Sequence, residues 1–351
     1  MNHTLTTGQK QNLYRDGYLV LKQVIPKEMA EKARRLLFER MGRLRRAAAE
    51  AAASGNVEAL AEASRLMGRS GGSATIMNLL NATPVKPLLE SALGAPVAPV
   101  RGAQLAILYP GEDEDTVNEA GFRNIETPFA GWCGHLDGLW NGGITTPPVD
   151  RDLSDEEEKE WQGERGMNSA LKYHPEHNTN ISCFTALVAV ALSDQRSIGV
   201  GNLGLLKGGH HKMEAFFRWQ REQGGPLGPE GPGWPRIDDK APNKHGLVHY
   251  PDKVKKAYKR SAIVADTGQI WPKPKFMKVQ TGDAIIVHYA TPHSSSRVLA
   301  ADPRMMVYFR TVAESRPEEF LSVYPDVLCD NWLEWEGMRE VRRKVRRSQK
   351  S

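Results

Sequence analysis

Runs of apolar residues and the polar stretches between them divide the chain into a helical beginning and a strand-rich remainder. Residues 8–15 predict a first helix that Thr6 or Thr7 can cap, and residues 18–21 predict a short strand after it. Pro26 opens a second helix, where a missing N–H group costs nothing, and this helix continues into an alanine-rich stretch. The N-terminal quarter is therefore expected to support a core that later residues build.

The later apolar runs are rich in β-branched residues and predict strands. Residues 284–287, which follow Gly282-Asp283, have the composition of a buried strand. A helix is expected over residues 212–223, before a loop of glycine and proline at residues 224–246. The predicted strands are residues 97–109, 181–192 and 205–206, and several more between residues 280 and 312.

A long polar stretch, residues 141–180, interrupts this series. Connections in compact domains run about 4–6 residues, and much longer ones are usually lids or binding loops. We expect this insert to cover a site and to help determine its specificity. Because no other stretch predicts a linker between two cores, residues 1–351 are expected to form one domain.

Composition narrows the class of protein. Hydrophobic residues make up 40% of the chain without an apolar run of about 18 residues, so no membrane span is expected. The first residues lack the apolar core of a signal peptide. The three cysteines, Cys133, Cys183 and Cys329, have no metal-type spacing. A cytoplasmic, reduced location is the expectation, with Cys133 a small packing residue.

The net charge of +5 suggests nucleic-acid binding at first sight, but its distribution argues against it. Residues 339–351 carry seven basic residues and one acidic residue, which leaves the rest of the chain nearly neutral. A basic C-terminal helix over residues 331–351, lying in solvent, explains this pattern. The lysines around Trp271 are likewise expected to be solvated. No nucleic-acid partner is expected.

The candidate chemistry lies in His135, Asp137 and His293. In a strand, residues two apart point to the same side, so His135 and Asp137 could grip one metal ion. A distant histidine can close the site from another strand. Two imidazoles and one carboxylate form the facial triad of non-haem Fe(II) oxygenases, which leaves three coordination positions open.

An HxD tripeptide alone is weak evidence, and the residues after His293 strengthen it. Ser295 follows two residues later, and Arg304 follows eleven residues later at the start of an apolar run. An arginine there could clamp a carboxylate bidentately, with a serine hydroxyl adding a hydrogen bond. His288 is the rival distal ligand, and Arg297 and Arg310 are the rivals of Arg304.

This pattern resembles the phytanoyl-CoA dioxygenase family of Fe(II)/2-oxoglutarate oxygenases. The resemblance spans roughly residues 5–313, with insertions, and includes the opening helix and "DGY" strand. Residues 201–212 resemble in part the family's turn before the distal histidine, with Lys207 and Gly209 in place of its proline and serine. His210 or His211 is expected to hold this turn, and His174 and His177 to lie on a surface loop.

The resemblance implies a mainly β fold with flanking α-helices around a double-stranded β-helix, of jelly-roll or cupin type. It implies Fe(II) held by His135, Asp137 and His293, with the far carboxylate of the cosubstrate 2-oxoglutarate bound by Arg304 and Ser295. The implied reaction uses O2 to hydroxylate a small organic molecule and releases succinate and CO2. A carboxylate at Asp137 favours hydroxylation over halogenation.

Three further residues are candidates for contacts with small molecules. Gln104 and Tyr109 lie on the strand before the HxD and could reach the cosubstrate, and Trp140 could form a wall of the substrate pocket. Two other classes remain open: a protein or peptide hydroxylase of the same chemistry, and a non-catalytic binding protein of the same fold. The substrate and the oligomeric state are not predicted.

Overall fold

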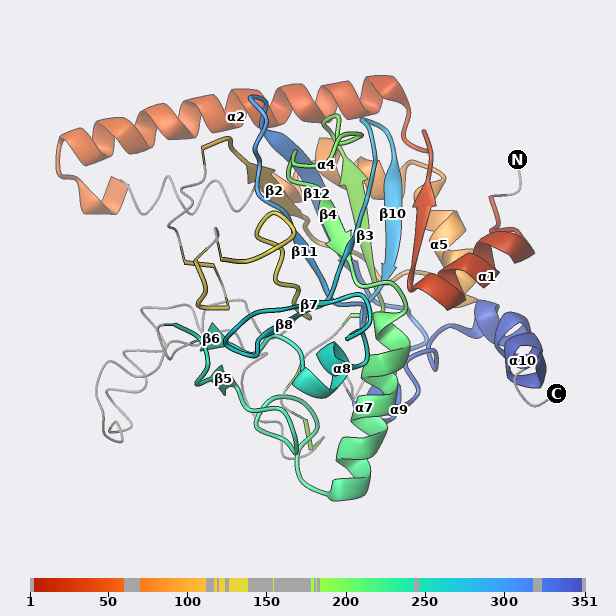
Figure 1. Cartoon of the computed structure of the whole chain (residues 1–351). Coiled ribbons are helices and arrows are strands. Elements are labelled where there is room, and N and C mark those ends of the chain that lie inside the picture. Colours follow the sequence, from red (N-terminus) through yellow and green to blue (C-terminus); the bar gives the residue numbers. More distant parts are fainter. Residues whose placement is uncertain are drawn as a thin grey trace.

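The computed structural model of the chain describes residues 3–59, 70–111, 117–118, 120–123, 126–137, 154, 178–179, 181, 184–242, 246–317 and 324–348. Antiparallel sheets and the helices around them make up this part of the molecule (Figure 1). The expectation of sheets flanked by helices is therefore confirmed. Among the described residues, no helix is both long enough and apolar enough to cross a membrane.

Within these ranges the larger sheet has five strands, in the order β1-β10-β3-β12-β2, each antiparallel to its neighbours. They are β1 (Tyr18–Leu21), β2 (Gln104–Leu108), β3 (Ala186–Ala191), β10 (Ala284–His288) and β12 (Arg304–Thr311). The smaller sheet consists of β11 (His293–Ser295), β4 (Leu203–Leu205) and β9 (Lys275–Phe276). Two short ribbons pair β5 (Ile237–Asp238) with β6 (Gly246–Leu247), and β7 (Ile263–Val264) with β8 (Ile270–Trp271).

The helices begin and end at recognisable signals. Thr6 caps α1 in a reciprocal capping box with Gln9, and Gly17 ends the helix at a φ of 82°. Pro26 precedes α2, as the sequence predicts. The helices are α1 (Thr7–Asp16), α2 (Lys27–Ala53), α4 (Ala74–Asn81), α5 (Val85–Leu93), α7 (Gly209–Gln223), α8 (Asp252–Lys256), α9 (Pro325–Cys329) and α10 (Arg339–Ser348), with 3-10 turns η1 (Ser70–Gly72) and η3 (Glu336–Met338).

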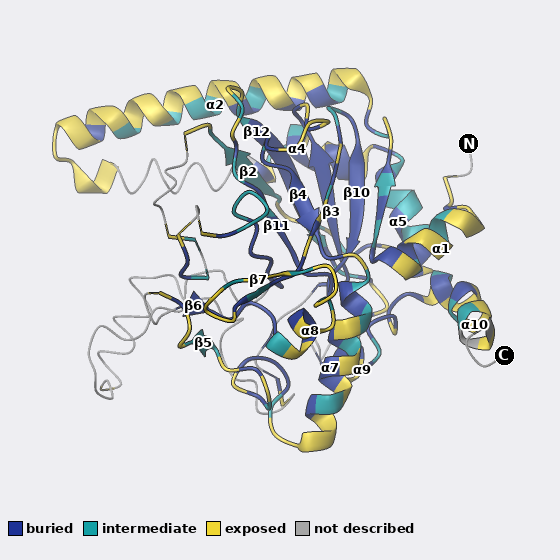
Figure 2. Ribbon diagram, viewed as in Figure 1, coloured by how far each residue is buried: buried dark blue, intermediate teal, exposed yellow. Residues whose placement is uncertain are grey.

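Successive side chains of β12 pack in two hydrophobic clusters, one on each face of the larger sheet. Met305, Val307 and Phe309 pack with residues of α1, α2, α4 and α5 on one face of the larger sheet. Met306 and Tyr308 pack on the other face, in a cluster that includes residues of β4 in the smaller sheet. Figure 2 shows β3, β10 and β12 of the larger sheet almost wholly buried, whereas most of α2 is exposed. By the same alternation, the even-numbered residues of β12 face the smaller sheet.

Two strand predictions differ from the structure. The strand expected over residues 97–109 begins only at Gln104, and Val97 instead forms an isolated bridge with Ala313. His288 and His293 lie on β10 and β11, in different sheets, and not on one strand. The chain turns between them, where the Thr291 N–H donates to the His288 carbonyl at 2.9 Å.

The C-terminal segment also differs from its prediction. The helix begins at Arg339, and the turns before it bury Trp332, Trp335 and Met338 against the helical core. Val341 of α10 is buried as well. Arg342 donates to both carboxylate oxygens of Asp330, at 2.6 and 2.7 Å. The basic composition gave no sign of this apolar side, so α10 packs on the helical core and is not a free basic arm.

Two buried histidines lie beside these tryptophans. The His288 ring stacks on Trp335, donates from Nε2 to the Asn331 carbonyl at 2.7 Å, and accepts at Nδ1 from the Ala290 N–H at 3.1 Å. Burial lowers the pKa of His288 to about 3. Burial also holds the pKa of His210 well below its ordinary value. Both rings are therefore neutral at pH 7.

We predict that the metal-free protein loses stability as the pH falls from 7 to 5. The His288 ring takes up a proton near pH 6.5 in the unfolded chain but only near pH 3 in the folded one, so acid favours unfolding throughout this window. The loss from this group is about 2 kcal/mol at pH 5. Urea unfolding at both pH values measures it. His288→Gln should make the pH dependence smaller, and His3→Gln, at the exposed N-terminus, should leave it unchanged; an equal pH dependence in both variants would contradict the assignment.

Candidate metal centre

Backbone hydrogen bonds join the segment of His135 to that of His293. The N–H of each residue donates to the carbonyl of the other, at 2.9 Å in both directions. Such a reciprocal pair sets two antiparallel residues directly opposite each other. The Gly134 N–H adds a bond to the Ser294 hydroxyl at 3.2 Å. Two histidines far apart in the sequence are thereby fixed side by side.

The sequence predicts that the HxD motif lies on a regular strand, and the structure differs. His135 forms an isolated bridge with His293, and Asp137 lies in a turn. Trp132 explains the local shape. Its ring is fully buried, and its Nε1 donates to the Gly204 carbonyl of β4 at 3.0 Å. A Cβ atom would lie 2.6 Å from this ring at Gly134 and 2.5 Å from it at Gly204. Glycine at both positions lets the motif fold down onto the smaller sheet.

The three candidate ligands converge on one buried point. The Nε2 atoms of His135 and His293 lie 3.6 and 3.7 Å from Oδ1 of Asp137, and the ligand atoms all lie within 4.8 Å of one another. These spacings leave a gap that suits a divalent ion with bonds of about 2.0–2.2 Å. Nδ1 of His293 donates to the Thr291 carbonyl at 2.9 Å, which leaves the Nε2 lone pair for a metal. The residues present therefore fit a metal ion.

Asp137 is held ionised by its neighbours. Burial by itself would raise the pKa of this carboxyl, but the His135 and His293 imidazoles and the charge of Arg310 hold it well below its ordinary value. Arg310 donates from Nε to Oδ2 of Asp137 at 2.8 Å. One carboxylate oxygen is thus occupied, and Oδ1 faces the two imidazoles.

A cavity of about 340 Å³ opens beside the triad. Six residues expected from the sequence line it: His135, Asp137, His293, Ser295, Arg304 and Gln104. Sequence reasoning missed Tyr308, and it named Arg310 only as a rival of Arg304 for the carboxylate. Tyr308 lies on the same face of β12 as Arg304, so strand parity was the signal that could have found it. Leu187 and Leu203 give the cavity part of its apolar wall.

Arg304 is a buried cation without an anionic partner among the described residues. Its exposed fraction is 2%. One terminal nitrogen donates to the Ala106 carbonyl at 3.3 Å, another to the Tyr308 hydroxyl, and Nε has no hydrogen-bond partner. Asp137 is the one carboxylate among the described residues that line the cavity, and Arg310 already engages it. A buried charge in this condition requires an anion.

The structure does not place the other two predicted contact residues, Tyr109 and Trp140, at the cavity. The Tyr109 ring packs under the guanidinium of Arg45 from α2, 3.8 Å from its centroid, and the structure does not bring it to the cavity. β2 ends one residue earlier, at Leu108. Trp140 lies outside the described residues, as does almost all of the expected lid at residues 141–180.

The rival histidines have structural roles. His288 belongs to the tryptophan cluster described above, in the other sheet from His293. His210 and His211 each donate from Nε2 to the Tyr14 carbonyl, at 2.9 and 2.8 Å, which ties the start of α7 to α1. This fits the expectation that they hold a turn. His174 and His177 lie outside the described residues.

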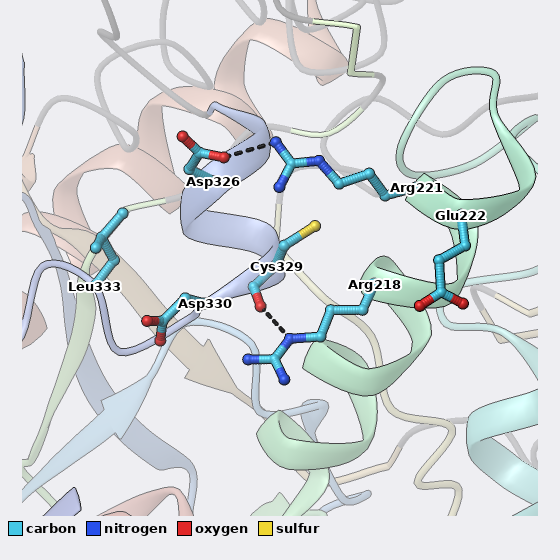
Figure 3. A pocket seen from close by; sticks show the side chains of 7 residues that line it. All are labelled: Arg218, Arg221, Glu222, Asp326, Cys329, Asp330 and Leu333. Carbon is cyan, nitrogen blue, oxygen red and sulfur yellow. Dashed lines mark hydrogen bonds and ion pairs between the residues drawn. The ribbon is translucent and has the colours of Figure 1, made fainter. Parts of the chain in front are cut away.

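A second cavity, of about 540 Å³, lies between α7 and α9 and shares no lining residue with the first. In Figure 3, Arg221 reaches Asp326 at 2.6 Å, and Arg218 donates from Nε to the Cys329 carbonyl at 2.6 Å. Asp330 pairs with Arg342. Burial raises the pKa of the Cys329 thiol, which keeps it protonated at pH 7. Because Arg221, Arg218 and Asp330 already have partners, we assign no binding or catalytic role to this cavity.

No protein-family model and no curated protein matches the chain. Similar solved structures include apo HygX from Streptomyces hygroscopicus, at 16% identity and a TM-score of 0.42, covering 89% of this chain and 88% of that one. The non-heme alpha ketoglutarate dependent carbocyclase SnoK from nogalamycin biosynthesis is 12% identical with a TM-score of 0.39, covering 88% and 84%. Likenesses this low do not establish a shared fold or activity, so membership of the phytanoyl-CoA dioxygenase family stays a prediction.

We predict that the chain binds one divalent metal ion through the triad. His293→Ala should lose the ion because the other two ligands cannot hold it alone, whereas His288→Gln should retain it because that ring belongs to the core. Metal content after anaerobic loading and desalting, measured by mass spectrometry, decides the matter. If His293→Ala retained the metal ion and a folded His288→Gln lost it, His293 would be the wrong choice of distal ligand.

Proposed function

We propose that the protein is an Fe(II)/2-oxoglutarate-dependent oxygenase that oxidises a C–H bond of a small organic molecule. One observation carries the proposal. A single cavity has the buried triad of His135, Asp137 and His293 together with Arg304, a buried cation with no anionic partner among the described residues. A metal ion and an anionic cosubstrate would satisfy both groups at once.

The donor set favours Fe(II). Two imidazoles and one carboxylate on one side of an ion form the triad of non-haem iron oxygenases, and the described residues contain no cysteine cluster that would favour zinc. Iron bound there would let O2 oxidise the substrate and 2-oxoglutarate together, one oxygen atom going to each, with succinate and CO2 formed from 2-oxoglutarate. Asp137 at the ligand position favours hydroxylation over halogenation.

The residues of the chain have distinct tasks in this proposal. Arg304 and Ser295 bind the far carboxylate of 2-oxoglutarate, with Gln104 as a further polar contact. Thr291 keeps Nε2 of His293 available as a ligand, and Arg310 orients Asp137 so that Oδ1 faces the metal. The apolar wall of Leu187 and Leu203 limits the access of water to the reacting centre.

The sheet arrangement supports the expected fold. A larger antiparallel sheet faces a smaller one, and the candidate cavity has lining residues from both. We propose that these are the two halves of a double-stranded β-helix of jelly-roll type in a single domain.

A cavity of about 340 Å³ lies within the usual range of about 300–1,000 Å³ for small-molecule sites, which favours a small substrate over a protein.

The direct test is turnover. Anaerobically iron-loaded protein should consume 2-oxoglutarate and form succinate once oxygen is admitted, slowly by itself and faster with a true substrate. His135→Ala should abolish this activity. No succinate from protein that retains iron and binds 2-oxoglutarate, across a broad substrate panel, would favour the non-catalytic alternative.

We predict that Arg304→Gln weakens 2-oxoglutarate binding by at least about thirtyfold. Removing one partner of a buried charge pair costs on the order of 2–5 kcal/mol, and 1.4 kcal/mol is tenfold in affinity. Calorimetric titration of the Ni(II)-loaded protein measures the effect without turnover. Arg260→Gln, at an exposed arginine, is the control. Wild-type affinity in Arg304→Gln with a large loss in Arg310→Gln would assign the carboxylate to the other arginine.

A further inference from the structure

The metal cavity adjoins a second space of about 480 Å³. Three residues line both: Gln104, Tyr308 and Arg310. The second space, here named the arginine annex, is completed by Gly72, Arg101, Gly102 and Ala103. A molecule bound beside the triad can therefore extend past Arg310 into the annex.

The annex has excess positive charge, because only one of its two arginines is paired: Arg310 pairs with Asp137, which lies outside the lining of the annex. Arg101 and Arg310 both line it, and its described lining contains no carboxylate. Arg101 makes no ion pair with any described residue. Arg310 uses Nε for Asp137, so its two terminal nitrogens remain available as donors. Two guanidinium groups around one space form a site for an oxyanion.

Close backbone contacts form the side of the annex that contains Gly72 and residues 101–103. The Ala103 N–H donates to the Gly71 carbonyl at 3.2 Å, which joins η1 to the residues before β2. A Cβ atom at Gly71 would lie 1.8 Å from the Ala103 carbonyl oxygen, so only glycine permits this approach. Gln104 pairs with Tyr308 in the sheet, and the residues before Gln104 consequently lie beside Arg310.

Arg310, one of the two arginines of the annex, lies well apart from Arg304. Arg304 begins β12, and Arg310 lies six residues later on the same face, which is roughly 20 Å along an extended strand. Arg310 contacts Asp137, whereas Arg304 contacts Tyr308 and the Ala106 carbonyl. An anion at Arg304 thus leaves the annex free for another.

We propose that the arginine annex binds an oxyanion group of the substrate, a carboxylate or a phosphate, through Arg101 and Arg310. The substrate is then a small anionic molecule whose charged end lies in the annex and whose oxidised carbon lies toward the triad. This assignment rests on the proposed function for the identity of the reaction. The anion site itself rests on the annex residues alone.

The test uses anionic probes on protein loaded with Ni(II) and saturating 2-oxoglutarate, so that Arg304 is already occupied. Phenyl phosphate and benzoate are titrated calorimetrically, with phenol and benzamide as uncharged counterparts. At least one anionic probe should bind, and its preference identifies phosphate or carboxylate. Arg101→Gln should weaken that probe about tenfold or more, since hydrogen bonds to charged groups contribute on this scale.

Arg260→Gln is the matched control, because it removes the same charge from an exposed position outside both cavities. It should leave probe affinity unchanged. Equal weakening in both variants would mean that only overall charge matters, and wild-type affinity in Arg101→Gln would exclude Arg101. Equal binding of charged and uncharged probes, or no binding of any probe, would also contradict the proposal that the annex binds an oxyanion.

The two proposals can fail separately. If the protein binds no 2-oxoglutarate, the proposed function is wrong, and the same titrations on metal-free protein, with Arg304→Gln beside Arg101→Gln, still test the annex. Probe binding that Arg304→Gln abolishes and Arg101→Gln leaves intact would then place the anion in the metal cavity instead. If 2-oxoglutarate binds and the probes fail, the annex is wrong and the proposed function stands.

Discussion

The reciprocal backbone hydrogen bonds between His135 and His293 are the contact on which the candidate site depends. Joining segments so far apart costs chain entropy, and two hydrogen bonds alone would not hold them. Burial of Trp132 against Gly204 adds apolar contact on the same side, and β11 is itself a strand of the smaller sheet. The candidate ligands are thus held by a packed sheet: His293 lies on β11, and the segment of His135 and Asp137 is bonded to it.

Charge on the inner face of β12 is the second constraint. Its outer face carries Met305, Val307 and Phe309, which pack with the helices, while its inner face carries two arginines among apolar neighbours. A buried cation is stable only with a partner. Arg310 finds one in Asp137, and Arg304 finds only neutral oxygens. Under the proposed function, this difference separates Arg310, which orients a metal ligand, from Arg304, which binds the cosubstrate.

Local signals in the sequence predicted local structure well. The helix cap at Thr6 or Thr7, the helix after Pro26 and the spacing from His293 to Ser295 and Arg304 all lie in short stretches of chain. Features that depend on packing were not predictable in this way. The turn before His293 sends it to another sheet than His288, and Trp332 and Trp335 draw an apparently solvated basic tail onto the core. The sequence names Arg310 only as a rival of Arg304, because its contact with Asp137 depends on how β12 packs against the HxD turn.

Arg310 links the two cavities physically. Its Nε donates to one oxygen of Asp137, and the residue lines both the metal cavity and the annex. A guanidinium is planar and rigid, so an anion bound to its terminal nitrogens fixes the orientation of Nε as well. Under the two proposals, an anionic substrate would therefore steady the carboxylate that binds the metal, and a neutral molecule of the same shape would not. Because such coupling is reciprocal, the metal-bound form should in turn favour the anion. The site would then respond to the charge of its substrate and not only to its size.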